Sequence, residues 1–522
     1  MRILIKGDVM NKKYKNLLRD SFFNDINGRS LDIYQRKIVL DNSESLLVVA
    51  GAGSGKTLTI IGKIKYLIEK LGINEREILC ISFTNETVNN LKEKVGYNID
   101  CFTFHKLSLT ILDDLNYEYY ICDDTLLDYI TDEFFEMIVF DETLSYFVME
   151  YLKGYIKDSM VTYNSLIEEY QIILENYKRS IKSFIKKIKT NNHSYNDFKE
   201  YVLKNNRVSN KDNIRDKNKA FLIIVFHILK LYTEELLSTK QIDFDDMISI
   251  ATNEVRKKGM KRHYKYIIID EFQDTSRVRY LLIKEIIKKT NAKLMCVGDD
   301  YQSIYKFSGC NLDLFINFKK YFNNAKVMYI KNTYRNSYQV IDTSCSFVRK
   351  NKYQLQKKLI AQFSLKNPIK IVYYERDNYR MMFNKLLDYL EEHDQKNILV
   401  LGRYNNDIKD VTRDNYSDGK IIYKDLDINY LTVHRSKGLE CDDIIILNMS
   451  NKLMGFPSQR EDDKVFDLIN SDRENYPYAE ERRLFYVALT RTKKNVYLMV
   501  PKGNPSIFID EIKTKTVDLI IK

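Results

Sequence analysis

The sequence lacks several features that mark specialised proteins. Its 522 residues include no tryptophan, only 5 prolines and 17 glycines, and they form no internal repeat. This argues against long linkers, low-complexity tails and solenoid architectures. No run of about 18 apolar residues is present, and the N-terminal apolar stretch is too short for a signal peptide. We therefore expect a cytoplasmic protein that does not enter a membrane.

The seven cysteines and six histidines are also few, and they form no metal-binding or disulfide pattern. No CxxC pair occurs, and no two histidines have HxxxH spacing. Several cysteines lie in apolar runs, such as Cys80 in EILCI and Cys296 in KLMCV. These patterns predict free, buried thiols in a reducing compartment, and they argue against zinc and iron–sulfur sites.

Positive charge is in modest excess. Lys and Arg number 83 against 72 Asp and Glu, which gives a formal net charge of +11. Such a balance favours a polyanionic partner, because Lys and Arg that neutralise phosphates release counterions. A lysine-rich solvated surface explains the charge equally well. Charge therefore supports a nucleic-acid partner without establishing one.

The hydrophobic pattern indicates α/β layers in more than one domain, since the chain is too long for a single core. Short, nearly continuous Val/Ile/Leu runs suit strands that are buried on both faces of a parallel sheet. The predicted strands cover residues 45–50, 77–82, 264–270, 293–298, 326–330, 397–402, 442–447 and 495–500. Residues 111–240 instead have a helical period and no clear strand, and we expect a helical insertion there.

The segment VVAGAGSGKTLTI (48–60) is the strongest local signal. A predicted strand runs into GAGSGKT and then into a helix, which is the context that a P-loop requires. Its glycines let backbone N–H groups face phosphates at a helix N-terminus. Lys56 would reach the β- and γ-phosphates of ATP, and the Thr57 hydroxyl would hold Mg²⁺. The predicted nucleotide-binding loop comprises Gly51, Ala52, Gly53, Ser54, Gly55, Lys56 and Thr57.

A P-loop enzyme also needs carboxylates at the end of a neighbouring strand. YKYIIIDEFQDTS (264–276) supplies four apolar residues followed by Asp270 and Glu271. Asp270 fits the Mg²⁺-holding role, through water, and Glu271 fits the base that orients and deprotonates the attacking water. Paired acids after a strand often only cap the next helix, but a P-loop without such partners would be incomplete.

Four long segments carry a family resemblance. They are DEFQDTS (270–276), VGDDYQSIYKFSG (297–309), LTVHRSKGLE (431–440) and EERRLFYVALTRTKK (480–494). In this order they resemble the UvrD/Rep/PcrA-type superfamily 1A DNA helicases, and residues 455–491 are most similar to the DNA helicase IV branch. The resemblance implies two RecA-like domains with ATP between them. The first would comprise 1–110 and 241–310, and the second 311–522, with 111–240 as the insertion.

The resemblance also assigns roles around the nucleotide. Arg335 in NTYRNS and Arg491 in ALTRTKK would reach across from the second domain as arginine fingers. The other implied contacts are Gln35 with the adenine edge, Tyr334 stacked on the base, Gln302 with the γ-phosphate, and Glu440 with the ribose or the domain coupling. An isolated Arg on a helix is usually a surface charge. Spread charge in phosphoryl transfer, however, is best met by guanidinium groups.

A bound strand needs aromatic side chains for its bases and amides or hydroxyls for its phosphates. The family motifs place such residues in ISFTNET, CFTFHKL, IYKFSG and TVHRSKG. The candidates are Phe83, Thr84, Asn85, Thr103, His105, Tyr305, Phe307 and His434. Aromatic residues in α/β proteins are more often part of the core, and motif position is what favours the binding role here.

Several departures from the family pattern stand out. Between NTYRNS and TVHRSKG there is too little sequence for the family's second insertion, so a 2B-like domain is expected to be minimal or absent. Leu58, Glu86 and Ser308 replace residues that are often Arg or Ser, Lys, and Arg. An acidic residue at position 86 should weaken contact with phosphates. Only a predicted strand and a short tail follow Arg491, so no fused nuclease is expected.

The leading hypothesis is a Mg-ATP-driven single-stranded-DNA translocase and 3′→5′ helicase acting on single strands or 3′-tailed duplexes. A role in DNA repair, recombination or anti-phage defence would fit it. The alternative is a DNA- and nucleotide-sensing regulatory subunit of a nuclease complex, because the chain also resembles the helicase-like subunit of the Gabija defence system. The sequence leaves open a nuclease partner, the choice between DNA and RNA, and the oligomeric state.

Overall fold

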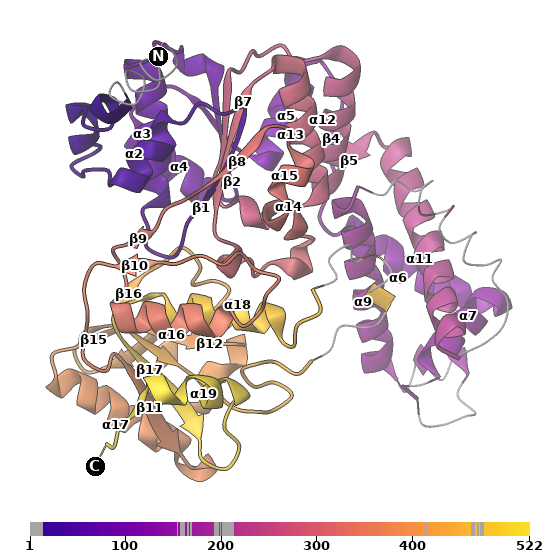
Figure 1. Cartoon of the computed structure of the whole chain (residues 1–522). Helices are drawn as coiled ribbons and strands as arrows, with labels where there is room; N and C mark the ends of the chain where they lie inside the picture. The colour runs from indigo at the N-terminus through magenta and orange to yellow at the C-terminus, as the bar shows by residue number, and fades with distance from the viewer. Residues whose placement is uncertain are drawn as a thin grey trace.

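The computed structural model describes residues 14–521, except 154, 157–161, 164–165, 168–169, 193–197, 199, 201–212, 414, 461–464, 467–468 and 470–473. Two α/β domains lie one above the other in Figure 1, and a group of helices projects from the upper one. Both sheets have a parallel core with helices on both faces. The predicted fold class, two RecA-like domains with a helical insertion, is confirmed.

The first domain contains a fully parallel sheet in the order β3-β2-β6-β7-β1-β8. Its strands are β1 (Ser45–Val49), β2 (Ile78–Ser82), β3 (Asp100–Thr103), β6 (Tyr266–Ile269), β7 (Lys293–Gly298) and β8 (Ala325–Tyr329). One face is covered by α2 (Ile33–Leu40), α3 (Lys56–Glu69) and α4 (Asn85–Val95). The other is covered by α5 (Phe104–Asp114), α12 (Phe244–Lys258), α13 (Arg277–Thr290), α14 (Asp313–Ile316) and α15 (Phe318–Tyr321).

The first domain extends further along the chain than expected. Its boundary at residue 310 was wrong, because β8 pairs in parallel with β1. Leu314, Phe315 and Phe318 of α14 and α15 are also buried in the core of this domain. The strand at 326–330 was predicted correctly, but its partner strand lies 280 residues earlier (Ser45 pairs with Ala325), and local pattern does not reveal such pairing.

The insertion consists mainly of α6 (Leu126–Met137), α7 (Glu142–Leu152), α9 (Gln171–Thr190) and α11 (Asn213–Ser238). In α9 the apolar residues recur at helical spacing and are buried, as expected for an amphipathic helix. One small difference from the expectation is the two-residue strand β4 (Tyr120–Ile121), which pairs with β5 (Gln241–Ile242) where the chain enters and leaves the insertion.

The second domain contains the sheet β13-β14-β15-β12-β16-β17-β11-β18. Its strands are β11 (Ile369–Tyr374), β12 (Asn397–Gly402), β13 (Tyr416–Ser417), β14 (Lys420–Tyr423), β15 (Leu426–Thr432), β16 (Cys441–Ile446), β17 (Thr492–Pro501) and β18 (Val517–Asp518). The helices α16 (Tyr338–Val348), α18 (Ala479–Leu489) and α19 (Ile507–Ile512) cover one face, and α17 (Tyr379–Glu392) covers the other. The interval between NTYRNS and TVHRSKG thus contributes α16, α17, β11 and β12 to this domain, with the β13–β14 hairpin added to them.

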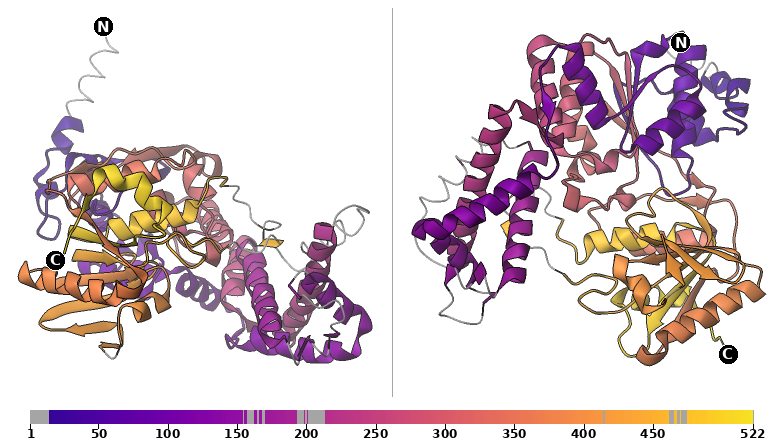
Figure 2. Two further views of the ribbon diagram at one scale, coloured as in Figure 1. Left: turned by 90° about the horizontal axis from the view of Figure 1, so that it is seen from below. Right: turned by 180° about the vertical axis from the view of Figure 1, so that it is seen from behind.

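A segment between β16 and α18 of the second domain reaches the insertion. Val465 is buried in the core of the insertion, and the ring of Phe466 lies 5.6 Å from that of Phe184 in α9. Asn191 donates a hydrogen bond of 3.0 Å from Nδ2 to the carbonyl of Ile469. The small yellow-orange piece beside α9 in Figure 1, and at the insertion in both views of Figure 2, marks this contact. The second domain is therefore in contact with the insertion as well as with the first domain.

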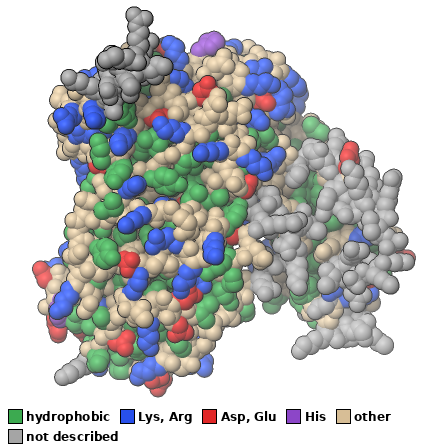
Figure 3. All heavy atoms as spheres, viewed as in Figure 1, with side chains coloured by type: hydrophobic (Ala, Val, Ile, Leu, Met, Phe, Trp, Pro, Cys, Tyr) green, Lys and Arg blue, Asp and Glu red, His purple; other side chains and the backbone are tan. Residues whose placement is uncertain are grey.

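The surface and the cysteines agree with the composition. Figure 3 shows Lys and Arg side chains spread over both α/β domains on the viewed face, with hydrophobic side chains between them. All seven cysteines are free and buried, as predicted. Within the described residues, no helix combines the length and the apolar character needed to cross a bilayer.

Candidate nucleotide site and strand-facing surface

The phosphate loop joins β1 to α3 at the carboxyl edge of the first sheet. Gly53 and Gly55 have φ values of +67° and +79°, a region that residues with a Cβ enter at a cost. A Cβ on Gly51 would collide with Leu359, and one on Gly53 would collide with Arg335. Helix α3 begins at Lys56, so its free N–H groups face the loop. The loop thus has the conformation and the crowding of a phosphate cradle.

The two acids follow β6 and lie beside this loop. Lys56 Nζ is 2.7 Å from Glu271 Oε1, and the backbone N–H of Glu271 donates to Asp270 Oδ1 at 2.9 Å. Burial and the Glu271 carboxylate raise the pKa of Asp270. Burial also disfavours ionised Glu271, but Lys56 and Lys437 outweigh it and lower the pKa of Glu271. Glu271 is therefore the ionised member of the pair and is able to accept a proton.

Glu271 is held in an uncommon backbone conformation. Its φ is +50°, which is rare for a residue other than glycine and concentrates at functional sites. Gln273 donates from Nε2 to Glu271 Oε2 at 2.6 Å, and its Oε1 accepts the N–H of Asp299 at 2.9 Å. A side-chain amide therefore joins the acid pair to the GDDYQS segment.

Gln302 and Arg491 meet across the two domains. Gln302 donates from Nε2 to Asp299 Oδ2 at 2.7 Å, and its Oε1 accepts from Arg491 Nη2 at 3.1 Å. Arg491 is 1% exposed. Burial and the nearby Arg335 lower its pKa to about 9, so it is still charged at neutral pH. The charged guanidinium of Arg491, from the second domain, therefore lies at the domain interface, in contact with Gln302 of the first domain.

Arg335 approaches the loop from the other side. Its Cβ packs on Gly53, and Nε donates to Glu440 Oε2 at 2.7 Å. The preceding Thr333 donates from Oγ1 to the carbonyl of Ala52 at 2.7 Å. Glu440 therefore orients Arg335, and neither of the roles expected for Glu440, the ribose contact and the domain coupling, is tested by a contact in the structure.

The adenine candidates lie together at the start of α2. Asp32 caps this helix, and Gln35 completes a capping box with it. Gln35 Nε2 also lies 3.3 Å from the carbonyl oxygen of Gly55, to which it donates, while Tyr334 donates to Asp32 Oδ2 at 3.0 Å. Tyr334 is 50% exposed, so one face of its ring is accessible beside the loop.

Several polar residues of the site were not singled out from the sequence. Lys437 contacts Asp274 Oδ2 and donates to the carbonyl of Gln302 at 2.7 Å. Lys357 forms buried ion pairs with Asp299 and Asp300. Lys437 stands inside a recognised motif and could have been found there, whereas nothing in the local sequence distinguishes Lys357.

The strand candidates of the first domain follow β2 and β3. Thr84 and Thr103 are the N-caps of α4 and α5 and accept backbone N–H groups with their hydroxyls. The Arg279 guanidinium lies 5.0 Å from the ring centroid of Phe83. Burial and Arg279 lower the pKa of His105 to about 4, so this imidazole is neutral at pH 7. Asn85, which begins α4, is exposed.

The remaining candidates form an aromatic cluster, which we define as Tyr305, Phe307 and His434. The three ring centroids are 5.8 to 6.4 Å apart. Tyr305 and Phe307 follow Gln302 in the GDDYQSIYKF segment, and His434 belongs to the second domain. Phe307 is 68% exposed, and burial, Arg403 and Lys437 lower the pKa of His434 to about 4. The cluster is uncharged at pH 7 and spans the domain interface.

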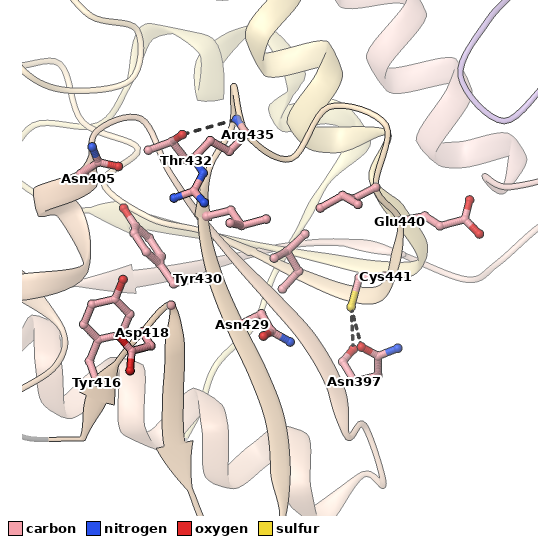
Figure 4. A pocket seen from close by; sticks show the side chains of 14 residues that line it. Asn397, Asn405, Tyr416, Asp418, Asn429, Tyr430, Thr432, Arg435, Glu440 and Cys441 are labelled. Atoms are coloured by element: carbon pink, nitrogen blue, oxygen red, sulfur yellow. Dashed lines mark hydrogen bonds between the residues drawn. The ribbon is translucent and has the colours of Figure 1, made fainter. Parts of the chain in front are cut away.

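A separate cavity lies in the second domain. Its volume is about 780 Å³, and its walls come mainly from β12, β15, the turn between β13 and β14, and the segment that joins β15 to β16. Figure 4 shows Asn397, Asn429 and Tyr430 along the walls, with Arg435 at the top and Glu440 at the right. The cavity does not include the phosphate loop and meets the nucleotide site only at Glu440.

The fold and the site define a P-loop NTPase with two RecA-like domains and its nucleotide site between them. Residues 31–323 match the UvrD/REP helicase N-terminal domain, and residues 412–503 match the UvrD-like helicase C-terminal domain. The chain belongs to the UvrD/REP family of ATP-driven DNA helicases, and the resemblance inferred from the motifs is confirmed.

Individual relatives agree with this assignment. DNA helicase IV of Escherichia coli (strain K12) is 26% identical over 520 residues, which cover 96% of this chain and 72% of that protein. A probable DNA helicase II homolog of Mycoplasma capricolum is 30% identical over 345 residues, or 63% of this chain and 42% of that protein. A probable DNA helicase of Mycoplasma pneumoniae is 24% identical, over 88% of this chain and 81% of that protein.

Proposed function

We propose that this chain hydrolyses Mg-ATP to translocate along single-stranded DNA and to unwind 3′-tailed duplexes in the 3′→5′ direction. The observation that carries the proposal is that one domain interface holds both sites. The contact between Gln302 and Arg491 and the aromatic cluster both join the GDDYQSIYKF segment of the first domain to residues of the second. A change in that interface driven by hydrolysis would therefore move the cluster.

The proposed chemistry assigns separate tasks to the two domains. Lys56 and the backbone N–H groups of the loop would bind the β- and γ-phosphates, and Glu271 would take the proton of the attacking water. Arg335 and Arg491 would stabilise the charge that spreads over the transferring phosphoryl group. Lys56 is paired with Glu271 at 2.7 Å, so binding of a phosphate by Lys56 would release the carboxylate for its role.

The residues beside the loop fit a hard cation. Mg²⁺ prefers oxygen ligands and retains several waters. Thr57, in the first turn of α3, and Asp270, at the end of β6, supply a hydroxyl and a carboxylate. Asp270 is 3% exposed, and the Lys56 ammonium pairs with Glu271 and not with Asp270. We propose that Thr57 and Asp270 hold Mg²⁺, which would neutralise phosphate charge.

Steady-state ATP hydrolysis tests this function. The rate is measured without nucleic acid, with single-stranded DNA, with single-stranded RNA and with blunt duplex, and Glu271→Gln serves as the blank. We expect strong stimulation by single-stranded DNA alone. Tight binding of ATP and DNA with a rate no higher than that of the blank would overturn the proposal.

Polarity requires a second assay. Duplexes with a 3′ tail, a 5′ tail or no tail are compared at equal tail length, and we expect unwinding from the 3′ tail only. Translocation without unwinding is separated from inactivity by displacement of streptavidin from a biotin placed at either end of a single strand.

The comparisons with known proteins do not favour the alternative of a nuclease-regulating subunit.

A further inference from the structure

A buried lysine outside every motif lies under the nucleotide site. The side chain of Lys357 is 2% exposed, and those of Asp299 and Asp300 are fully buried. Its ammonium contacts Asp299 Oδ1, lies 2.7 Å from Asp300 Oδ1, and stands 3.6 Å from the ring centroid of Tyr301. Three adjacent residues of the GDDYQS segment thus surround a single cation.

This lysine is one step removed from the proposed γ-phosphate contact. Lys357 binds one oxygen of Asp299, and the other oxygen of Asp299 accepts the Gln302 amide at 2.7 Å. The Gln302 carbonyl in turn accepts from Arg491 at 3.1 Å. Since the carboxylate requires a donor and the guanidinium requires an acceptor, these two contacts fix which way the Gln302 amide faces. Asp299 therefore links Lys357 to Gln302 through its two carboxylate oxygens.

Burial makes the cation necessary. A fully buried carboxylate is costly without a paired charge, and here two carboxylates, Asp299 and Asp300, lie side by side. Burial by itself would lower the pKa of Lys357, but the two carboxylates raise it well above its usual value. The lysine is therefore charged at any pH at which the protein works, and it keeps Asp299 an acceptor for Gln302.

The segment that carries Lys357 is attached at several points. Leu355 donates its N–H to Asp300 Oδ2 at 2.9 Å, and Tyr301 donates to the carbonyl of Leu355 at 2.8 Å. Two residues beyond Lys357, the Leu359 side chain packs on Gly51 of the phosphate loop. The same short stretch therefore contacts the phosphate loop and the Gln302 anchor, and it can set their relative position.

We propose that Lys357 is a positioning residue of the ATPase, which holds Asp299 so that Gln302 and Arg491 are aimed at the γ-phosphate. The inference rests on the proposed function, since it assigns a residue to the same site. It predicts that removal of Lys357 impairs the chemical step and leaves the binding of ATP nearly intact, because the phosphate loop, Gln35 and Tyr334 are untouched.

Lys357→Met alone leaves two buried carboxylates without a cation, and this variant is at risk of unfolding. Lys357→Met combined with Asp300→Asn keeps the net charge of the cluster unchanged, because one carboxylate and one cation are removed together, and Asp299 remains as the single buried carboxylate. Asp299 and Gln302 are unchanged in this double variant. The neighbouring Lys358, which is exposed, supplies the matched control Lys358→Met.

The measurements are the melting temperature, the affinity for a fluorescent ATP analogue, and kcat and KM with and without single-stranded DNA. For the double variant we expect a melting temperature above that of Lys357→Met alone and a nucleotide affinity close to that of the wild type. Its kcat should fall by about 10- to 100-fold, the usual effect of misplacing a catalytic group by about 1 Å. Lys358→Met should behave as the wild type.

Recovery of kcat in the double variant to the wild-type value would overturn the inference, since Lys357 would then only balance charge. A parallel loss of nucleotide affinity and kcat would overturn it too, because the defect would lie in the phosphate loop. Failure of the proposed function has a different signature: the wild type itself would show no stimulation by single-stranded DNA. The basal rate without DNA still compares the variants in that event.

Discussion

The nucleotide site and the strand-facing surface are built in opposite ways. In the nucleotide site the acting groups are buried and hydrogen-bonded: Asp270, Gln302 and Arg491 are 3%, 4% and 1% exposed, and Gln302 and Arg491 bind each other. On the strand-facing surface Phe307 is 68% exposed, and its neighbours are held by ring contacts. When groups share hydrogen bonds, removal of one also misplaces the others, so the effects on activity are large and not additive. Each aromatic ring that stacks on a base, in contrast, contributes its own share of the binding energy. Changes in the first region should therefore abolish turnover, and changes in the second should only shift affinity.

The largest effect is expected from Lys56→Ala. It removes the phosphate-binding ammonium and leaves Glu271 without its partner at 2.7 Å, so ATP hydrolysis should fall to the level of Glu271→Gln. Steady-state hydrolysis and a thermal melt check this, and the fold should persist. Lys70→Ala, at the other end of the same helix, is the matched control. Unchanged turnover in Lys56→Ala would exclude the assigned site.

Arg491→Ala should have the next largest effect. Loss of an arginine finger costs about 10³-fold or more in kcat, and ATP binding should be kept, because the phosphate loop is intact. Single-turnover hydrolysis and nucleotide titration separate the two quantities. The control is Lys494→Ala, an exposed residue three positions further on that pairs with Asp442. A loss of affinity without a loss of kcat would contradict the finger role.

Phe307→Ala should leave the maximal rate unchanged and weaken the binding of single-stranded DNA by about 1–3 kcal/mol, the value of one stacked base. The DNA concentration that gives half-maximal hydrolysis measures this directly. Phe140→Ala is the control, since Phe140 is 92% exposed on the insertion. A lower rate at saturating DNA would contradict the separation of the two regions, because Phe307 would then affect catalysis as well as DNA binding.

The smallest effect is expected from Glu86→Lys. Glu86 is exposed in the first turn of α4, beside Phe83, Thr84 and Asn85. A lysine there should add about one phosphate contact, which steepens the dependence of affinity on salt by roughly 0.7 in the log–log slope for a single strand. Titrations at several salt concentrations measure it, with Glu93→Lys at the far end of α4 as the control. An unchanged slope would indicate that the bound DNA does not pass close to residue 86.

The predicted strands with continuous apolar runs were all confirmed, and two of the strands that were missed have a physical explanation. β15 reads LDINYLT, and only its alternate residues Leu426, Ile428 and Tyr430 are buried, because one face of the strand packs on the core, a pattern that lacks a continuous apolar run. β3 has four residues and only one of them is fully buried. The domain boundary at 310 failed for another reason, since the membership of β8 depends on its pairing with β1 and not on its own sequence.

The sequence by itself determined the phosphate loop, the acid pair and the α/β class, because each depends on residues close together in the chain whose spacing dictates their geometry. The structure decided how these parts meet. The contact between Lys357 and Asp299 joins residues 58 positions apart, that between Tyr305 and His434 joins residues 129 apart, and that between Gln302 and Arg491 joins residues 189 apart. No local pattern records such contacts, because they form only when two separate sheets pack against one interface and exclude water from the charges between them.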